Sequence, residues 1–423
     1  MNFKGKKLLV IGGAFQHCKL VEAAHEMGAI VYVVDYLSVE KAPAKQIADK
    51  HFEYNITDID DIVTMCKEEH IDGVVSAYLD ACQLPYQQVC EKLGVPCFGT
   101  KEQFHILTDK TAFIDFCIKN GVDVIPQYAE DDLKNGTAEY PVFIKPCDSR
   151  GSRGQSVCQN YEEAVKAIEF AKSESASGKV VIEKYMGGKQ DFSMSYLFAD
   201  GEAHLVRTGD RYLGAKKDGM DKSSVFSYSP SDFTVQYLSG SDKKVVNMLK
   251  NLGIKNGPVF FQGFIDDDIV RVYDPGLRFP GAEYDRCYNS ANDTDICKAL
   301  VEFALTDRIT YVPADNSALL NGKCAANLFV VVRPGTIAEI KGLEEVRADR
   351  SVICVADKYR VGSVVGDYRN VRQRYGEIDL LCNSREEMAE KVECIYKTLQ
   401  ILDENGEDMK ISIFDTELLK EKK

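Results

Sequence analysis

Apolar runs and amphipathic segments alternate along residues 6–100. The runs LLVIGG, IVYVVDY and GVVSAY are separated by HCKLVEAAHEMG and DIDDIVTMCKEEH, in which apolar residues recur at helical spacing. Continuously apolar strands between amphipathic helices are typical of a parallel sheet that is covered on both faces. We therefore predict an N-terminal parallel α/β domain over residues 1–100.

The pattern changes after residue 100 and again near residue 310. Residues 101–127 are predicted to form a helix that Thr108 or Asp109 caps. The stretch RTGDRYLGAKKDGMDKSSVFSYSPSD is predicted to be a long charged loop, which is unusual in a compact domain unless it has a function. From about residue 310, Pro-Gly turns, the strand SVICVA and the helix SREEMAEKVECIYKTLQIL predict a third unit. The predicted domains are 1–100, 101–310 and 311–423.

Length and composition are those of a globular protein with several subdomains. The 423 residues exceed one ordinary core, and a hydrophobic fraction of 45% with 28% charged residues carries no signature of disorder. A net charge of −14 argues against broad nucleic-acid binding, and no apolar stretch reaches membrane-spanning length. The 14 cysteines include no CxxC pair, which favours reduced thiols over disulfides or zinc. We expect a cytoplasmic protein that binds neither nucleic acid nor membrane.

The segment GPVFFQGFIDDDIVRVYDPGLRFPG, residues 257–281, is the strongest candidate for a functional site. An apolar strand delivers Gln262, an acidic turn reverses the chain, and a second β-rich run delivers Asp274, with Arg278 just beyond it. Neighbouring strands would aim an oxygen ligand, a carboxylate and a guanidinium at one place. That set suits a magnesium-bound triphosphate, because Mg²⁺ prefers oxygen ligands and phosphoryl transfer needs fixed positive charge. The alternative is a hairpin with an acidic tip.

A second candidate is the segment FIKPCDSRGSRGQSV. Lys145 ends an apolar strand, and the loop after it combines Gly151 and Gly154 with hydroxyls and arginines. Glycines let backbone N–H groups approach phosphate oxygens, and the lysine neutralises phosphate charge. The lysine precedes the glycines, so this is not a Walker loop. We favour phosphate binding over a plain surface hairpin.

Two glycines at the end of the first predicted strand raise the question of a dinucleotide site. Gly12 and Gly13 follow that strand and Asp35 follows the second one, but the full GxGxxG fingerprint is absent. A tight turn is therefore favoured. His17, Asp35 and Asp80 are then expected to edge a crevice over the strand ends, where open α/β sheets place their ligands.

Taken in chain order, these segments resemble a known arrangement. Candidate residues occur as Lys110, Lys145 with its glycine loop, Glu183-Lys184-Tyr185-Met186, Gln262, Asp274 and Arg278. The order resembles the ATP-grasp superfamily, in which two α+β subdomains close on ATP and an acyl phosphate is made. The resemblance covers nearly the whole chain. It implies an N-terminal α/β pre-ATP-grasp domain, a two-lobed ATP-grasp domain with a mobile ATP lobe at about 127–190, and a C-terminal α+β lid-side domain like that of amino-acid ligases and biotin carboxylases.

The resemblance also implies a role for each matching residue. Two lysines would hold the phosphates, a Ser-Gly loop would fold over them, and the end of the strand VVIEK would form the adenine hinge, with a glutamine where the family usually places a ribose-binding glutamate. Mg²⁺ or Mn²⁺ would be held by Gln262 and Asp274, and Arg278 would steady the transferred phosphoryl group or acyl phosphate. The residues assigned to ATP are Lys110, Lys145, Ser152, Gly154, Glu183, Lys184, Met186 and Gln190.

This chain departs from the family pattern at the metal motif. The usual E-x-N-P-R motif appears here as Asp274-Pro275-Gly276-Leu277-Arg278, so an aspartate replaces the glutamate and Gly276 replaces the asparagine ligand. One Mg²⁺ can still be bridged by Asp274 and the phosphates, because this ion keeps several waters. A second ion would need Asp266 or water.

The reaction that the resemblance implies is ATP-dependent activation of a carboxylate, followed by attack of an amine. No Ser/His or Cys/His set is needed, because positioning and electrostatics suffice for such chemistry. The candidate for carboxylate recognition is the predicted charged loop around Arg207, Asp210, Arg211, Lys216 and Lys217. Arg211 is favoured within it, since arginine binds a carboxylate bidentately. The substrates would be a small carboxylate and a small amine, and the surface leaves room for a homodimer. The alternative, which Gly276 favours, is a nucleotide-binding regulatory or scaffold protein with a degenerate metal site.

Overall fold

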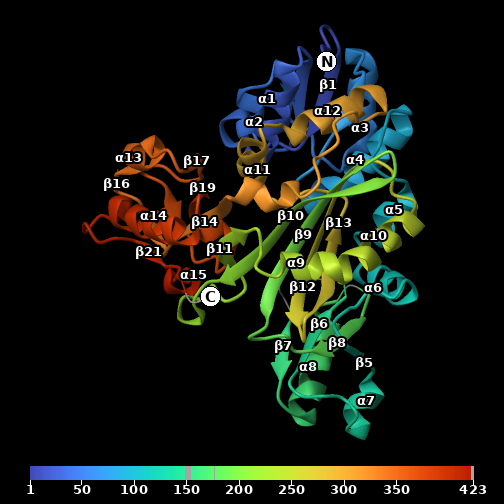
Figure 1. Ribbon diagram of the computed structural model, residues 1–423, viewed down its shortest axis with the longest axis vertical. Helices are drawn as coiled ribbons and strands as arrows, with labels where there is room; N and C mark the ends of the chain where they lie inside the picture. The colour runs from blue at the N-terminus through green and yellow to red at the C-terminus, as the bar shows by residue number, and fades with distance from the viewer. Residues whose placement is uncertain (148–153, 176, 421–423) are drawn as a thin grey trace.

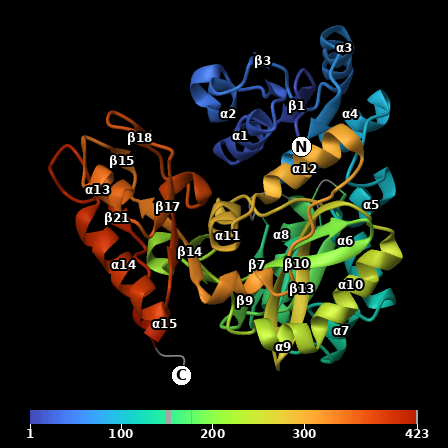
Figure 2. The ribbon, with the colours of Figure 1, turned by 45° about the horizontal axis from the view of Figure 1, so that its top comes forward.

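The computed structural model describes residues 1–147, 154–175 and 177–420 and arranges them in three parts around one long sheet (Figure 1). The N-terminal unit lies at one end of the long strands, a small lobe lies at the other end, and the C-terminal unit lies to one side. The turned view in Figure 2 again separates the C-terminal unit from the small lobe. The mixed α/β and α+β class predicted from the sequence is confirmed.

The N-terminal unit is a parallel sheet, as predicted. Its strand order is β3–β2–β1–β4, and each strand runs parallel to its neighbour. Four of the five residues in β1 and in β2 are buried, because both faces of these strands are covered by helices. The elements are β1 Lys7–Ile11, α1 Cys18–Glu26, β2 Ile30–Val34, α2 Pro43–Gln46, β3 Lys50–Phe52, α3 Ile59–Glu69, β4 Gly73–Val75 and α4 Asp80–Leu93.

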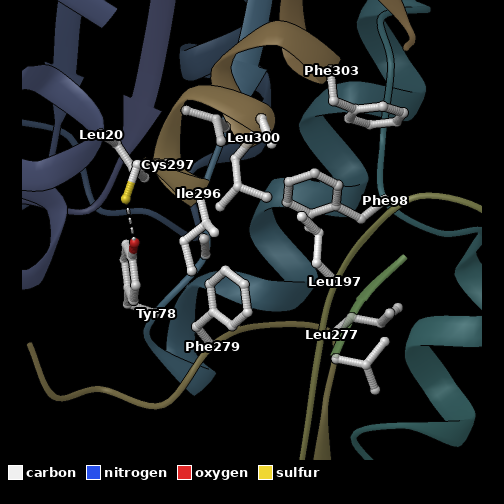
Figure 3. Packing of buried hydrophobic residues seen from close by; sticks show 14 of the residues in the cluster. Leu20, Tyr78, Phe98, Leu197, Leu277, Phe279, Ile296, Cys297, Leu300 and Phe303 are labelled. Carbon is white, nitrogen blue, oxygen red and sulfur yellow. Dashed lines mark hydrogen bonds between the residues drawn. The ribbon is translucent and has the colours of Figure 1, made fainter. Parts of the chain in front are cut away.

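A helix from much later in the chain completes this unit. Helix α12, Ile296–Thr306, packs against α1 and β4, and its apolar side chains point at the N-terminal core (Figure 3). Phe303 stacks on Phe98 with ring centroids 5.2 Å apart, and the Tyr78 hydroxyl lies 3.2 Å from the Cys297 sulfur. The sequence pattern did not predict this return of the chain, because an amphipathic helix does not reveal which sheet it covers.

The long sheet has nine strands and joins the predicted hairpin to the C-terminal unit. Its order is β13–β12–β9–β10–β11–β14–β19–β17, with β21 beside β14, and the paired strands are antiparallel. Strands from both sides of residue 310 pair within this one sheet. The division into the domains 1–100, 101–310 and 311–423 stays a prediction. The strands are β9 Gln190–Ala199, β10 Glu202–Leu213, β11 Ser224–Ser229, β12 Gly257–Asp266, β13 Ile269–Gly276, β14 Cys324–Val332, β17 Val352–Asp357, β19 Arg374–Cys382 and β21 Lys410–Ile411.

The small lobe has its own sheet and its own core. Four antiparallel strands in the order β5–β8–β6–β7 pack against helix α8, and the buried residues form a cluster separate from the main core. The elements are β5 Gln127–Tyr128, α7 Glu130–Asn135, β6 Val142–Pro146, β7 Ser156–Cys158, α8 Tyr161–Ser173 and β8 Val180–Lys184.

The remaining elements cover the long sheet or edge the C-terminal unit. Within the described ranges no helix combines the length and the apolarity needed to cross a membrane. The helices are α5 Lys101–Ile106, α6 Lys110–Lys119, α9 Thr234–Ser239, α10 Ser241–Leu252, α11 Tyr284–Asn292, α13 Leu343–Ala348, α14 Arg385–Thr398 and α15 Glu417–Lys420, and the short strands are β15 Gly335–Thr336, β16 Glu339–Lys341, β18 Val364–Val365 and β20 Gln400–Leu402.

Two sequence-based expectations need correction. The single helix expected over 101–127 is two helices, α5 and α6, and Asp109 caps the second by accepting from the backbone N–H of Ala112 at 2.9 Å. Half of the predicted charged loop is strand, because residues 207–213 belong to β10 and residues 224–229 are β11. Its polar residues looked like those of a solvated loop, but Arg207, Thr208 and Asp210 are buried within the long sheet.

The contact between β4 and α12 gives a test of this fold. A Cβ atom at Gly73 would lie 2.2 Å from the carbonyl oxygen of Ala304, so glycine is required for the close approach. We expect Gly73→Ala to lower the free energy of unfolding by about 1–3 kcal/mol, because the clash is with backbone and the helix must shift. Urea denaturation measures this change. An unchanged midpoint would mean that α12 does not pack on β4 in this way.

Candidate functional site

The predicted hairpin is present, and its register places two candidate ligands opposite each other. Strands β12 and β13 are joined by the turn Asp267-Asp268, where both residues have positive φ, as a tight hairpin requires. Gln262 pairs directly with Asp274 across the two strands. Directly opposed side chains leave a sheet on the same face with Cβ atoms about 5 Å apart. We call Gln262 and Asp274 the metal pair.

Positive charges from three segments act on the carboxylate of the metal pair. Burial raises the pKa of Asp274, while Lys110, Arg278 and Lys145 act to lower the same pKa. Lys110 begins α6, Lys145 lies in β6 of the small lobe, and Arg278 follows the hairpin. Three cations that are far apart in the sequence are thus within electrostatic range of one partly buried acid.

Arg278 is buried and is held by the N-terminal unit. Its Nε donates to Asp80 Oδ1 at 2.5 Å, an NH group donates to the carbonyl oxygen of Phe279 at 2.9 Å, and the guanidinium lies 5.1 Å from the centre of the Phe260 ring. A Cβ atom at Gly276 would lie 3.0 Å from Arg278 Cγ. The arginine therefore occupies part of the space that a longer residue at position 276 would need.

In the small lobe, Lys145 and Glu183 form a buried ion pair. Lys145 Nζ lies 2.6 Å from Glu183 Oε1, and Gln127 donates to the other carboxylate oxygen at 3.3 Å. The pair fixes the lysine head on one face of the lobe, because β6 and β8 are adjacent strands. The sequence assigned both residues to the nucleotide but did not predict that they contact each other.

The loop after Lys145 is described only at its ends. Ser152, which the sequence assigned to this loop, lies outside the described residues. Gly154 has φ +72°, and a Cβ atom there would lie 2.6 Å from Pro146 Cγ, so the position requires glycine.

The tip of the hairpin is tied to the connection between the small lobe and the long sheet. Asp266 contacts Lys189 at 2.5 Å, Arg271 at 2.9 Å and Lys184 at 3.4 Å. Hydrogen bonding from Lys189, followed by Arg271, lowers the pKa of Asp266 to about 2. Asp266 is four strand residues from Gln262, about 13 Å along β12. It is therefore not placed to complete the metal pair, contrary to the option raised from the sequence.

The remaining residues assigned to the nucleotide follow the same connection. Lys184 ends β8, Met186 is buried, and Gln190 begins β9. The Gln190 amide donates to the backbone carbonyl oxygens of Asp191 and Arg211 at 3.1 and 3.3 Å. Their proposed contacts with adenine and ribose stay predictions.

A cleft of about 1130 Å³ lies between the N-terminal unit, the long sheet and the C-terminal unit. The metal pair, Arg278 and Arg211 line it together with Asp80. In the described part of the chain, no three His, Cys, Asp or Glu side chains gather as a metal site, so an ion at the metal pair would need further oxygen atoms from its ligand or from water. The predicted residues that do not line this cleft are Lys110, Lys145, Gly154, Glu183, Lys184, Met186 and Gln190.

Arg211 lies on strand β10 and already has an acidic partner. Its NH1 group donates to Asp191 Oδ2 at 2.8 Å and to the Tyr273 hydroxyl at 3.3 Å. Burial raises the pKa of Asp191 to about 6, although Arg211 acts to lower it. The carboxylate recognition predicted for Arg211 stays a prediction, and any incoming acid would share the guanidinium with Asp191.

The crevice predicted over the N-terminal strands is partly filled by His17. A Cβ atom at Gly12 would lie 2.4 Å from the His17 ring, and the imidazole is buried without a hydrogen-bond partner in the described structure. Burial lowers the pKa of His17 to about 4, so the ring is neutral. Asp35 accepts the backbone N–H of Gly13 at 2.8 Å. The space that a pyrophosphate would need above Gly12 is therefore occupied, in agreement with the predicted tight turn.

Several polar residues of the cleft were not predicted from the sequence. Most of them lie on β11, β14 and β19, whereas Lys358 follows β17, and their signal is a polar side chain within or directly beside a strand. Asn327 in CAANLFVVV is the clearest example, because it is the one amide in an otherwise apolar run. The additional cleft residues are Ser227, Asn327, Lys358, Arg374 and Glu377.

Three family models match successive parts of the chain. Residues 8–89 match the PylC-like N-terminal domain, residues 105–248 match the ATP binding domain of the carbamoyl-phosphate synthase L chain, and residues 328–402 match the L-amino acid ligase C-terminal domain 2. Together these matches reach from the parallel sheet to the C-terminal unit.

Individual relatives share the same architecture at low identity. A formate-dependent phosphoribosylglycinamide formyltransferase of Prochlorococcus marinus is 25% identical over 279 residues, which are 62% of this chain and 68% of that protein. The L-amino acid ligase of Bacillus licheniformis superposes with a TM-score of 0.76 at 19% identity, covering 95% of this chain and 100% of that one. The biotin carboxylase domain of a Hydrogenobacter thermophilus 2-oxoglutarate carboxylase, solved with MgADP and bicarbonate, has a TM-score of 0.76 at 17% identity, covering 94% and 90%. These structures establish the fold.

The buried Asp191 predicts a defined pH dependence. Its raised pKa means that the folded state holds the proton more tightly, so the stabilisation is fully present below about pH 4 and is lost as the pH rises to about 6. Asp191→Asn removes this titration. We expect the difference in free energy of unfolding between wild type and variant to change by on the order of 2 kcal/mol between pH 4 and pH 6.5. Urea denaturation at both pH values measures it, with the exposed Asp267→Asn as control, and a pH-independent difference would contradict it.

Proposed function

We propose that this chain, which belongs to the ATP-grasp superfamily, is an ATP-dependent ligase that activates a carboxylate as an acyl phosphate for attack by an amine. The observation that carries the proposal is the register of the hairpin, which sets the metal pair side by side under the charges of Lys110, Arg278 and Lys145. Phosphoryl transfer needs positioning and charge neutralisation more than a protein nucleophile. The matched family models for ligase and ATP-binding domains agree with this reaction class.

The donor set at the metal pair fits a magnesium ion. Gln262 offers an amide oxygen and Asp274 a carboxylate, both hard oxygen ligands, and Mg²⁺ commonly keeps water and phosphate oxygens for its other positions. When bound, the ion would neutralise charge on the transferred phosphate. Since Gly276 supplies no side chain and Asp266 is ion-paired with Lys189, we propose one ion rather than two.

The other predicted residues take roles around the triphosphate. Lys110 and Lys145 would contact phosphate oxygens, and Arg278, fixed by Asp80, would steady the acyl phosphate without reorganising. The adenine would rest at the end of β8 beside Met186 and the ribose near Gln190. The residues 127–190 would then act as the mobile ATP lobe of the domain 101–310. Dimer formation and a cytoplasmic location stay predictions.

The alternative function is a nucleotide-binding regulator with a degenerate metal site. Gly276 favours it, because the asparagine ligand of the family motif is missing and Arg278 fills part of its place. A screen for ADP or phosphate release over pooled carboxylates and pooled amines, with products identified by mass spectrometry, separates the two functions. Release that needs both pools supports the ligase. Tight ATP binding with no release in any pool supports the regulator.

The carboxylate of the metal pair is the most direct test of mechanism. We expect Asp274→Asn to lower turnover at least about a hundredfold, because the amide removes the charge that would hold the ion, while ATP affinity changes little. Steady-state kinetics and calorimetry measure the two effects. Asp267→Asn, at the exposed tip of the same hairpin, is the matched control and should turn over normally. An active Asp274→Asn enzyme would exclude this role.

The lysine of the small lobe tests where the nucleotide binds. We expect Lys145→Ala to weaken ATP binding about tenfold or more, because the variant loses a charge-assisted contact with a phosphate oxygen and leaves Glu183 buried without its ion pair. Calorimetric titration with ATP measures the loss. Lys166→Ala on the exposed face of α8 controls for a general change of charge in the lobe. Equal affinity of Lys145→Ala and wild type would show that the nucleotide lies elsewhere.

A further inference from the structure

The small lobe, residues 127–184, is joined to the rest of the chain by two short connections. Residues 120–126 lead from α6 into β5, and residues 185–189 lead from β8 to β9; we call them the entry connection and the exit connection. The backbone N–H of Lys184 donates to the carbonyl oxygen of Pro126 at 2.9 Å, so the two connections meet where they reach the lobe. Any change in the orientation of the lobe relative to the long sheet must therefore take place in these two segments.

Both connections are fixed to the hairpin that carries the metal pair. In the entry connection, Val124 forms a parallel bridge with Val272 of β13, and the Val272 N–H donates to the carbonyl oxygen of Asp123 at 3.0 Å. The exit connection leads into β9, whose first residue Gln190 pairs with Ile265 of β12. The two connections thus meet the two strands of the hairpin near its tip.

Asp266, the last residue of β12, joins the two connections at this point. Its carboxylate lies 2.5 Å from Nζ of Lys189, which ends the exit connection, and 3.4 Å from Nζ of Lys184, which precedes it. Arg271 Nε donates to the same carboxylate at 2.9 Å, and Arg271 NH1 donates to the carbonyl oxygen of Val124 at 3.4 Å. One carboxylate is therefore in contact with the exit connection directly and with the entry connection through Arg271.

The burial of these groups shows which of them is the fixed centre. The Asp266 side chain is 1% exposed, whereas the side chains of Lys184, Lys189 and Arg271 are 28%, 39% and 21% exposed. Three partly exposed cations thus converge on one enclosed anion. Removing that anion leaves all three without their shared partner, because each contact is a charge-assisted one.

The origin of the cations indicates more than a local role in the turn. Arg271 lies on the same hairpin, so its contact alone would only stabilise the hairpin tip. The two lysines come from the exit side of the small lobe, and Lys184 is 82 residues before Asp266 in the sequence. Their convergence on Asp266 links the position of β8 to the long sheet.

We propose that Asp266 is a positioning residue, a pivot that sets the orientation of the small lobe against the long sheet and thereby places Lys145 opposite the metal pair. Lys145 lies on β6, which pairs with β8, and β8 ends at Lys184. The flexible lysine side chain lets Lys184 follow the lobe while Asp266 stays with the sheet. The part of this inference that concerns ATP rests on the ligase function proposed above, and the part that concerns lobe orientation does not.

Hydrogen–deuterium exchange of the full chain without nucleotide tests the pivot directly. We expect Asp266→Asn to speed the exchange of backbone amides in residues 120–128 and 184–190 about tenfold, because both connections lose their shared charged partner. Exchange in β1 and β14 should stay unchanged. Asp268→Asn, exposed in the turn of the same hairpin, makes the same change of charge and should exchange like the wild type.

The pattern of exchange decides between a pivot and a merely structural residue. Faster exchange confined to residues 264–271 would mean that Asp266 only closes its own turn, and it would overturn the proposal. Unchanged exchange, or faster exchange throughout the long sheet, would overturn it as well. If Asp266→Asn does not fold, Lys189→Met takes its place, since this partly exposed lysine makes the shortest of the three contacts. Residues 184–190 should then exchange severalfold faster, and unchanged exchange there refutes the pivot.

ATP binding and turnover test the consequence for the proposed reaction. We expect Asp266→Asn to raise both the Kd and the KM of ATP about fivefold while kcat at saturating ATP stays within about twofold, because bound nucleotide restores the orientation of the lobe. This is the reverse of the effect expected for Asp274→Asn. A lower kcat with unchanged ATP affinity would contradict the pivot.

The two experiments separate this inference from the proposed function. A chain that binds no ATP refutes the proposed function, and the exchange pattern still decides whether Asp266 orients the lobe. Faster exchange in both connections with unchanged ATP affinity overturns the link between Asp266 and the nucleotide.

Discussion

The register of one sheet is the constraint on which the whole candidate site depends. Side chains alternate between the two faces of a strand, so a slip of one residue in any pairing would turn its polar set away from the cleft. Pairings from β13 to β19 keep Asp274, Gln262, Arg211, Ser227 and Asn327 on one side. The bulge after Gln262 interrupts this pattern only beyond the metal pair, toward the hairpin tip.

The four arginines Arg207, Arg211, Arg278 and Arg374 that line the cleft differ in how their charge is balanced. Arg278 and Arg211 each form an ion pair with a carboxylate, which fixes the position of the guanidinium and neutralises part of its charge. Arg207 and Arg374 are fixed instead by serine, amide, carbonyl and aromatic groups. One surface therefore combines guanidinium groups that are ion-paired with guanidinium groups whose partners are neutral.

Local signals were enough to predict the parts of the fold that have short-range causes. The parallel sheet and the hairpin with its acidic turn follow from periodicity and turn chemistry, and Asp109 is one of the two caps that the sequence offered for this region. Strand β10 was predicted to be loop because its buried arginines make it as polar as a loop. Arg207 donates hydrogen bonds to Ser227 and Asn327 on neighbouring strands, and the sequence alone does not show that these strands are adjacent. The ion pair of Lys145 with Glu183 joins residues 38 apart, and no local pattern encodes such a contact.

The return of the chain through α12 has a consequence for dissecting this protein. The parallel sheet and the grasp region look like successive modules along the sequence, yet Ile296, Leu300 and Phe303 complete the interior of the first module. A fragment that starts after residue 100 would expose the apolar face of α12 to water and would tend to self-associate. The packing of the parallel-sheet unit therefore includes a helix that lies far beyond residue 100, and a cut near that residue would separate the two.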